Sequence, residues 1–498
     1  MENLKAPYAI AGAVATTISA YIYFSSRTNE AKAKQVGARL PPGPKRVFLL
    51  GNLLNFPKDH WYKTFTSWGK QYEAAEDLAG KRAAIYSGRP YMRMLLDLMG
   101  AGFSMVFTQP SAEFNEQRKL FRISLGPQIV GNYDRLIQQR VESFIGDMHG
   151  FEGDPHPQVA RTFSTILTVI AYGEKFYSEH GEALVQLNIE NTHLLSWALT
   201  KFWAVDVVAF LRYVPSWVPG ANFQRVARTS SDQVQRVRFW PFGYVKGALT
   251  KGTADDSLVS KLLADSIFAE STIRDAAAIM YSAGTDTTST MLINLFYNLV
   301  LHPEWQAKLQ EELDDVVGRG HLPTAQDVPK LRILDVIWKE SFRLHPPVPL
   351  GIAFFERMEH AFDQRLGIPH VSTEADVYNG LYIPKGSMIH CNIGAMMRDP
   401  RVWGEDCNEF NPSRFLPEIN PQVENLPDIS TIPFGFGRRL CPGRFLAERA
   451  GRQLAASVMS TYTLLPVKDA AITSTMPFED TTISRPLDFK CHFKPRFD

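Results

Sequence analysis

The sequence contains little cysteine and has no excess of charge of either sign. Its four cysteines, in 498 residues, show no paired spacing. This argues against a disulfide framework or a zinc site and fits a reducing compartment. Lysine and arginine number 53 and acidic residues 52, so the global charge argues against a nucleic-acid-binding protein. No repeat or low-complexity tract divides the chain, and we expect no nucleic acid among its partners.

Charge is also missing from Ala6–Phe24, a run of 19 residues. This is about the length that crosses a bilayer core of about 30 Å. A secretory signal peptide is the alternative, but no small-residue cleavage site followed by a cysteine-paired domain supports it. Basic residues follow the run and place its C-terminal side in the cytosol. We expect a transmembrane anchor at 1–28, a basic linker and proline-rich hinge at 29–46, and one folded domain at 47–498.

Strand signals are few, whereas apolar residues at helical spacing are common. The coarse prediction is therefore a mainly α protein with minor β structure, an α+β fold with a helix-rich body and a small sheet. The clearest expected helices are Ser271–Leu301, Pro303–Val317 and Leu331–His345. The expected strands are Leu381–Ile383, Met388–Asn392 and Phe489–Phe493.

One cysteine lies in a glycine-rich run, Phe434-Gly-Phe-Gly-Arg-Arg-Leu-Cys441-Pro-Gly443. A helical pattern follows from Pro442 to Met459, with the proline at the preferred first position. The glycines allow backbone conformations closed to other residues and a close approach to a flat ligand. A sulfur at a helix N-terminus also meets N–H groups that favour the thiolate. A cysteine in an ordinary loop is the alternative interpretation.

The pattern F-x-x-G-x-R-x-C-x-G resembles the haem-binding loop of the cytochrome P-450 family, in the fungal, microsomal form. The resemblance implies haem b (iron protoporphyrin IX) as cofactor and Cys441 as the axial ligand of its iron. It also places Phe434 and Gly435 in the cofactor site. A thiolate opposite bound oxygen favours O–O cleavage.

The segment Glu340-Ser-Phe-Arg343 lies in one expected helix, and its two charged side chains share a face. Such pairs are usually solvated. Here Asn411-Pro-Ser-Arg414-Phe415 follows, and the order resembles the family's buried Glu-Arg-Arg network, with Arg414 as third member. The resemblance implies a structural role, since removing one partner would leave a buried charge unpaired.

Within the expected helix Ser271–Leu301, the segment Ala283-Gly-Thr-Asp-Thr-Thr288 resembles the family's oxygen-activation motif. The resemblance implies that Gly284 leaves room for dioxygen, and that Thr287 and Asp286 deliver protons as the catalytic pair. The alternative is that these threonines simply bond back to the preceding helical turn.

Arg118 matches the family's W-x-x-x-R element, except that Phe114 replaces the tryptophan. The resemblance implies that Arg118 and Arg439 bind the haem propionates, which suits guanidinium geometry. The replacement removes an indole N–H that could bond a propionate, and an ordinary surface arginine is the alternative interpretation of Arg118.

Aromatic residues and prolines crowd the stretch Asn191–Phe223. They fit either a core segment or a second membrane contact, because tryptophan and tyrosine favour the membrane interface. Relatives have the substrate lid there.

The resemblance implies a monooxygenase that inserts one atom of O2 into a lipophilic small molecule, in fungal secondary metabolism. The chain has no flavin or nicotinamide motif, so electrons would come from an NADPH-cytochrome P-450 reductase. We expect a single-pass protein of the endoplasmic reticulum membrane, in contact with membrane lipid, with its catalytic domain cytosolic. Five basic residues could form a surface on which the reductase docks; the alternative is that they are solvated charges scattered over the surface. They are Lys119, Arg122, Arg438, Arg444 and Arg452.

Two other hypotheses about the function of this chain stay open. A haem-thiolate isomerase or dehydratase shares the cysteine loop but usually lacks the acid–alcohol pair. A non-functional splicing or gene-model product is the second, because the chain departs from its relatives twice. Two sheet strands are missing after Tyr72, and Ala353–Arg365 is inserted between Leu350-Gly-Ile352 and its repeat Leu366-Gly-Ile368. The sequence identifies neither the substrate nor the oligomeric state.

Overall fold

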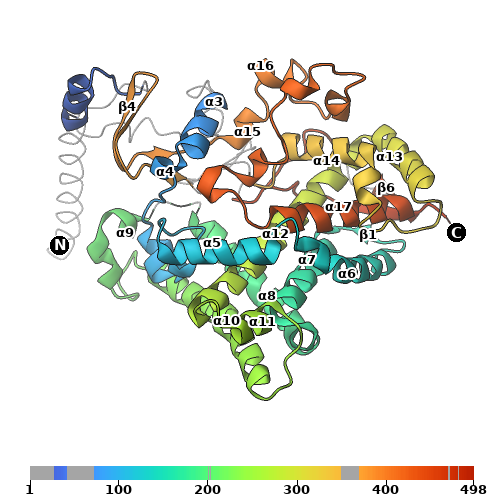
Figure 1. Ribbon diagram of the computed structural model, residues 1–498, viewed down its shortest axis with the longest axis horizontal. Helices are drawn as coiled ribbons and strands as arrows, with labels where there is room; N and C mark the ends of the chain where they lie inside the picture. Colours follow the sequence, from blue (N-terminus) through green and yellow to red (C-terminus); the bar gives the residue numbers. More distant parts are fainter. Residues whose placement is uncertain are drawn as a thin grey trace.

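The long helix α12 (Glu270–Leu301) runs through the middle of the molecule, and the other major helices surround it (Figure 1). It packs against α5, α7, α10, α11, α13, α14 and α17. Most of its residues are buried, which explains why its sequence is apolar on every face rather than along one stripe.

The computed structural model describes residues 27–41, 72–199, 201, 203–348, 369–468, 472–479 and 482–497. The hydrophobic run expected to form the anchor lies outside these residues, as do most of the hinge and the insertion at 353–365. The junction after Tyr72 is described and lies within helix α3 (Tyr72–Ala75). None of the described helices combines the length and apolar character needed to cross a bilayer.

Helices dominate the described chain, as predicted. The helices other than α12 are α3 (Tyr72–Ala75), α4 (Ala83–Tyr86), α5 (Ala112–Leu125), α6 (Asp134–Asp147), α7 (His156–Tyr172), α8 (Glu174–Leu199), α9 (Ala204–Val207), α10 (Phe223–Thr250), α11 (Leu258–Asp265), α13 (Pro303–Val316), α14 (Arg332–Leu344), α15 (Ile393–Met396), α16 (Pro400–Trp403) and α17 (Arg444–Thr461). The three helices expected around 271–345 are confirmed to within one residue at each end.

The strands form small antiparallel sheets, in the order β1-β7-β6, β2-β5 and β3-β4. Their bounds are β1 (Glu152–Gly153), β2 (His370–Val371), β3 (Asp376–Tyr378), β4 (Leu381–Ile383), β5 (Met388–Ile389), β6 (Tyr462–Pro466) and β7 (Cys491–Pro495). The strand at 381–383 is as predicted. The prediction for 388–392 was too long, and the last strand begins two residues later than expected because its register is set by pairing with β6.

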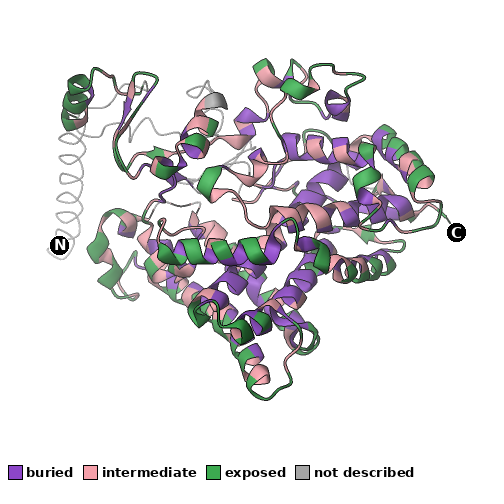
Figure 2. Cartoon of the chain, viewed as in Figure 1, coloured by how far each residue is buried: buried purple, intermediate pink, exposed green. Residues whose placement is uncertain are grey.

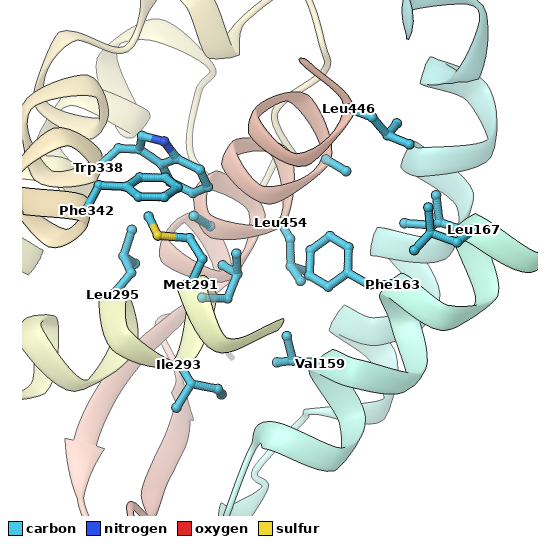
Figure 3. Close-up of a cluster of buried hydrophobic side chains, with 14 of the residues drawn as sticks. Val159, Phe163, Leu167, Met291, Ile293, Leu295, Trp338, Phe342, Leu446 and Leu454 are labelled. Atoms are coloured by element: carbon cyan, nitrogen blue, oxygen red, sulfur yellow. The ribbon is translucent and has the colours of Figure 1, made fainter. Parts of the chain in front are cut away.

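The largest core cluster lies where α7, α12, α14 and α17 meet (Figure 3). Trp338 of α14 is 2% exposed and packs on α17 at Gly451, where a Cβ atom would lie 2.5 Å from the indole ring. A tryptophan buried in this way contributes on the order of 3–5 kcal/mol relative to alanine. Figure 2 shows buried residues concentrated in these helices, whereas α10 and α13 are exposed along their outer faces. This core holds α12 and α17 in fixed positions relative to each other.

Candidate active site

A cavity of about 370 Å³ lies between α12 and the loop that carries Cys441. On the α12 side, Ala283, Gly284 and Thr287 line it. On the opposite side, Phe434 and Cys441 line it. The two motifs that the sequence analysis treated separately therefore face one shared space, which suits a flat ligand held between them.

The cysteine loop is fixed by its own backbone. The Cys441 N–H donates to the Phe434 carbonyl at 2.8 Å, which closes the turn. Gly435 has φ 92°, a conformation that favours glycine. At Gly437 a Cβ atom would lie 2.4 Å from the Ala79 carbonyl oxygen, so only glycine allows the loop to approach that neighbouring segment.

The prediction that Pro442 begins the following helix was wrong. Pro442 and Gly443 form a turn, and α17 begins at Arg444 and ends at Thr461. The turn still directs backbone N–H groups at the sulfur. Hydrogen bonds from Gly443 and Arg444 lower the pKa of Cys441, although burial outweighs them and raises it overall. A bound metal ion would supply further charge stabilisation of the thiolate.

A second cysteine, Cys391, also lines the cavity. Burial raises the pKa of this thiol to about 11, so it stays protonated at neutral pH. Cys407 and Cys491 are buried in the core instead. Of the four cysteines, Cys441 is therefore the one whose surroundings supply hydrogen bonds to a thiolate.

On α12, Thr287 lines the cavity while its hydroxyl donates to the Ala283 carbonyl at 2.8 Å. The back-bonded arrangement considered for these threonines is therefore present. Because that bond uses only the hydroxyl hydrogen, the oxygen can still accept a hydrogen bond from a molecule in the cavity. Gly284 has an additional role that the sequence did not indicate, since a Cβ atom there would lie 2.8 Å from Leu167 of α7.

Asp286 is not among the residues that line the cavity. Burial raises the pKa of its carboxyl to about 6, against lowering contributions from Arg485 and from a hydrogen bond with Thr192. A carboxyl with this pKa can both hold and release a proton near neutral pH, which is the property that general acid–base chemistry needs.

Comparison with known proteins identifies the chain. A sequence profile described as cytochrome P-450 matches residues 63–492. Cytochrome P-450 monooxygenase 98 of Postia placenta is 31% identical, over 92% of this chain and 90% of the relative. The monooxygenase COX1 of Coprinopsis cinerea is also 31% identical, over 97% of this chain and 96% of the relative. The chain belongs to the cytochrome P-450 family.

The fold agrees with this assignment. A zebrafish cytochrome P-450, solved with abiraterone, superposes with a TM-score of 0.65 over 88% of this chain and 100% of its own, at 20% identity. The protein is thus a cytochrome P-450 monooxygenase. Membership of the family implies a haem-thiolate cofactor, O2 as a reactant and a redox partner.

The cavity is suited to the acidic groups of a haem. Arg118 of α5 donates to the Leu440 carbonyl at 2.6 Å, and Arg439 donates to the carbonyls of Ser87, Met105 and Thr108 at 2.6–2.8 Å. Among the described residues, no carboxylate pairs with either guanidinium. Burial lowers the pKa of Arg118, and burial together with Arg118 lowers that of Arg439 to about 10. Two neighbouring, partly buried cations whose hydrogen bonds go only to carbonyls fit the two propionates.

Two further cavity residues were missed from the sequence. Arg89 is 7% exposed and donates to the carbonyls of Val106 and Pro369 at 2.9 and 2.8 Å. His370, on β2, bonds the Tyr86 carbonyl through Nδ1 at 2.7 Å. Burial lowers the pKa of His370 to about 4, and Arg89 adds to the effect, so the ring is neutral. No local pattern marks either residue, since their place in the cavity depends on contacts between distant segments.

Glu340, Arg343 and Arg414 lie together, as the motif order indicated. Arg343 donates from Nε and Nη2 to the Glu340 carboxylate at 2.7 and 2.8 Å, and Arg414 donates to the same carboxylate at 3.1 Å. Asp406, which the sequence did not single out, accepts a further bond from Arg414 at 3.0 Å. None of the three predicted members lines the cavity.

The aromatic stretch Asn191–Phe223 has one part that packs in the interior and one part that is exposed. Trp197 and Trp203 pack edge to face, 5.1 Å apart, against a small apolar cluster that includes Met94 and Leu95. Tyr213 and Trp217, by contrast, are 72% and 81% exposed. The first part is thus core, and the second is an exposed aromatic surface.

Proposed function

We propose that this chain inserts one atom of O2 into a lipophilic small molecule, in fungal secondary metabolism, with electrons from an NADPH-cytochrome P-450 reductase. One observation carries the proposal: Cys441 and Thr287 line a single cavity, in which Arg118 and Arg439 donate hydrogen bonds only to backbone carbonyls of the described residues. Apolar side chains from several helices supply most of the remaining lining, which favours an apolar substrate. They include Phe121, Phe163, Ile166, Leu167, Ile279 and Met280.

Haem b, when bound, supplies oxygen binding and O–O cleavage. Cys441 would bind its iron, Phe434 and Gly435 would form part of its site, and Arg118, Arg439, Arg89 and His370 would hold its acidic groups. The Thr287 oxygen would accept a hydrogen bond in the cavity and order a proton donor there. Asp286 would supply the proton and recover it from solvent, while the apolar lining excludes bulk water.

The exposed aromatic residues Tyr213 and Trp217 support contact of the catalytic domain with membrane lipid, because such rings favour the membrane interface. We place the protein at the endoplasmic reticulum membrane on this basis and on the charge-free N-terminal run. The basic surface proposed to bind the reductase contains fewer exposed residues than the five expected from the sequence. Arg452 is paired with Asp335 at 2.7 Å. Arg444 is only partly exposed, and its guanidinium carbon lies 4.5 Å from the centre of the Phe445 ring. The exposed Lys119, Arg122 and Arg438 remain as the main members.

The thiolate assignment is tested by the absorption of the reduced protein with carbon monoxide. The full-length protein should show the thiolate-specific band, and Cys441→Ala should lose it. Cys391→Ala is the matched control, because Cys391 lines the same cavity, and Cys491→Ala controls for a buried thiol. Loss of the band in either control, with retention in Cys441→Ala, would overturn the assignment.

A monooxygenase and a haem-thiolate isomerase differ in their need for protons at the distal side. Thr287→Ala should keep haem and ligand binding but divert a larger share of the NADPH electrons to hydrogen peroxide, because the ordered proton donor is lost. Peroxide release per NADPH, with reductase present, measures this. Thr285→Ala is the control on the same helix, since that hydroxyl is buried and bonds the Tyr281 carbonyl. Equal peroxide release in wild type and Thr287→Ala would favour the isomerase.

A further inference from the structure

One side of the cavity is formed by the short segment Phe103–Val106, which we call the wall. Met105 and Val106 of the wall line the cavity. The Met105 carbonyl accepts a hydrogen bond from Arg439 at 2.7 Å, and the Val106 carbonyl accepts one from Arg89 at 2.9 Å. The position of the wall therefore affects both the shape of the cavity and the arginines that lie in it.

Gln117 of α5 holds the backbone of the wall. Its Nε2 donates to the Phe103 carbonyl at 3.0 Å, and its Oε1 accepts from the Met105 N–H at 3.1 Å. Gln117 is 5% exposed, so water competes little for these bonds. Both bonds go to the backbone, and the position of the Phe103 ring is set by other contacts.

Arg238 of α10 lies over the Phe103 ring. Its guanidinium carbon is 4.3 Å from the centre of the ring, a distance typical of a cation–π contact. The same guanidinium donates from Nε and Nη2 to one carboxylate oxygen of Asp275, on α12, at 3.0 and 2.8 Å. Both charged side chains are 12% exposed. Arg238 thus connects the wall to α12, the helix that carries Thr287.

The Asp275 carboxylate has a second partner that keeps it in place. Arg274 donates from Nε and Nη2 to its two oxygens at 2.7 and 3.1 Å. The Arg274 guanidinium carbon in turn lies 4.3 Å from the centre of the Phe239 ring. Replacing Arg238 would therefore leave Asp275 paired, so that such a variant is not expected to contain an unpaired buried charge.

The wall lies at the border between two apolar clusters. Met105 belongs to the large core cluster, whereas Met99 and Ala101, just before the wall, belong to the smaller one. Between them, a Cβ atom at Gly100 would lie 3.3 Å from the Ser231 hydroxyl of α10, so the chain lies directly against that helix. A segment at the edge of the main core depends more on individual contacts than one inside it.

We propose that Arg238 is a positioning residue that clamps the wall to α12 and thereby limits the size of the molecule that enters the cavity. While the guanidinium holds the Phe103 ring, Met105 and Val106 keep their places at the cavity. When this contact is broken, the wall moves outward and a bulky molecule passes. A small molecule needs no such movement. The inference rests on the proposed function in taking the cavity as the haem site, and it adds a determinant of ligand size.

The test compares a small and a bulky azole, imidazole and 1-tritylimidazole, each of which binds the iron through a ring nitrogen. Stopped-flow absorbance of the full-length, ferric, haem-loaded protein gives the two association rate constants without turnover. Arg238→Gln should raise the rate constant of 1-tritylimidazole about 10-fold, as expected when one charged contact no longer has to break. The rate constant of imidazole should change less than about 2-fold, so the ratio of the two rises.

A second variant separates the clamp from general loosening of the helices. Phe103→Leu removes the ring but keeps the ion pair of Arg238 with Asp275, and it should raise the same ratio. The double variant should show no further rise, because both changes break one contact. Arg496→Gln breaks a comparably buried pair with Asp314 and is the control, in which the ratio should stay at the wild-type value.

The proposal is overturned by an unchanged ratio in Arg238→Gln, by effects that multiply in the double variant, or by a raised ratio in Arg496→Gln. If Arg238→Gln does not fold, Arg238→Lys takes its place under the same criteria, because it keeps the charge but not the planar group over the ring. Absence of the carbon monoxide band in the wild type would count against the proposed function. An unchanged ratio in protein that shows this band overturns the present inference alone.

Discussion

Two groups of arginines in this molecule, one buried and one partly buried, have different kinds of partners. Arg343 and Arg414 share the carboxylate of Glu340, and all three side chains are at most 7% exposed. Arg118 and Arg439, at the cavity, donate to backbone carbonyls only. The first group is electrostatically complete within the protein, while the second carries positive charge that an anionic ligand can neutralise. Burial alone thus does not distinguish a structural arginine from a binding one, and the nature of its partners does.

The largest effect should come from breaking the complete group. Glu340→Gln would leave Arg343 buried with only carbonyl partners, and we expect a loss of about 3–5 kcal/mol in the free energy of unfolding. Urea unfolding of the haem-loaded protein measures it. Glu418→Gln is the matched control, because Glu418 pairs with Arg332 at the surface, where both side chains are more than 50% exposed, and should cost less than about 1 kcal/mol. Similar urea midpoints for Glu340→Gln and Glu418→Gln would contradict the view that the buried group stabilises the fold more than a surface pair does.

A smaller and selective effect is expected in the open group. Arg118→Gln removes one charged hydrogen bond to a propionate, worth about 1.5–3 kcal/mol, so haem affinity should fall about 10- to 100-fold. Haem transfer to an apo-globin acceptor measures the loss.

Unfolding of the haem-free protein should change little in that variant, because the one bond that Arg118 makes in the described structure is to the Leu440 carbonyl. Arg122→Gln, on the same helix but exposed, should keep wild-type affinity. Equal haem loss in Arg118→Gln and Arg122→Gln would mean that the location of Arg118 in the cavity does not determine haem affinity.

The smallest effect concerns His370, which lies among the cavity arginines. Its folded-state pKa, about 4, is below the unfolded value of 6.5. Between these values the unfolded chain binds more protons, so the stability contributed by the neutral ring is lost as the pH falls from about 6.5 to about 4.

His370→Gln should therefore flatten the pH dependence of unfolding in that range, as measured by denaturation of the haem-free protein. Haem loading should also flatten it, since propionates would offset the positive field of Arg89 and Arg439. A steeper dependence after loading would count against the anion site.

Local patterns predicted much of the fold and part of the site. The helix at 270–301 and the ion pair of Glu340 with Arg343 follow from spacing within one segment. The start of α17 was misplaced by two residues, because Pro442 is compatible with either a turn or a first helical position. Arg89 and His370 could not be found in this way, because their partners come from segments up to 284 residues away.

By itself, the sequence determined the long helix that carries Thr287 and the glycine-rich turn that carries Cys441, because helical spacing and glycine conformations depend on neighbouring residues. Only the tertiary structure decided which charges meet. Arg485 meets Glu479 and His156 because the segment that carries it is bonded to Pro347 and to Asn294 of α12. Electrostatic control of a buried carboxyl depends on distance in space and on removal of water, and neither quantity is contained in the order of residues along the chain.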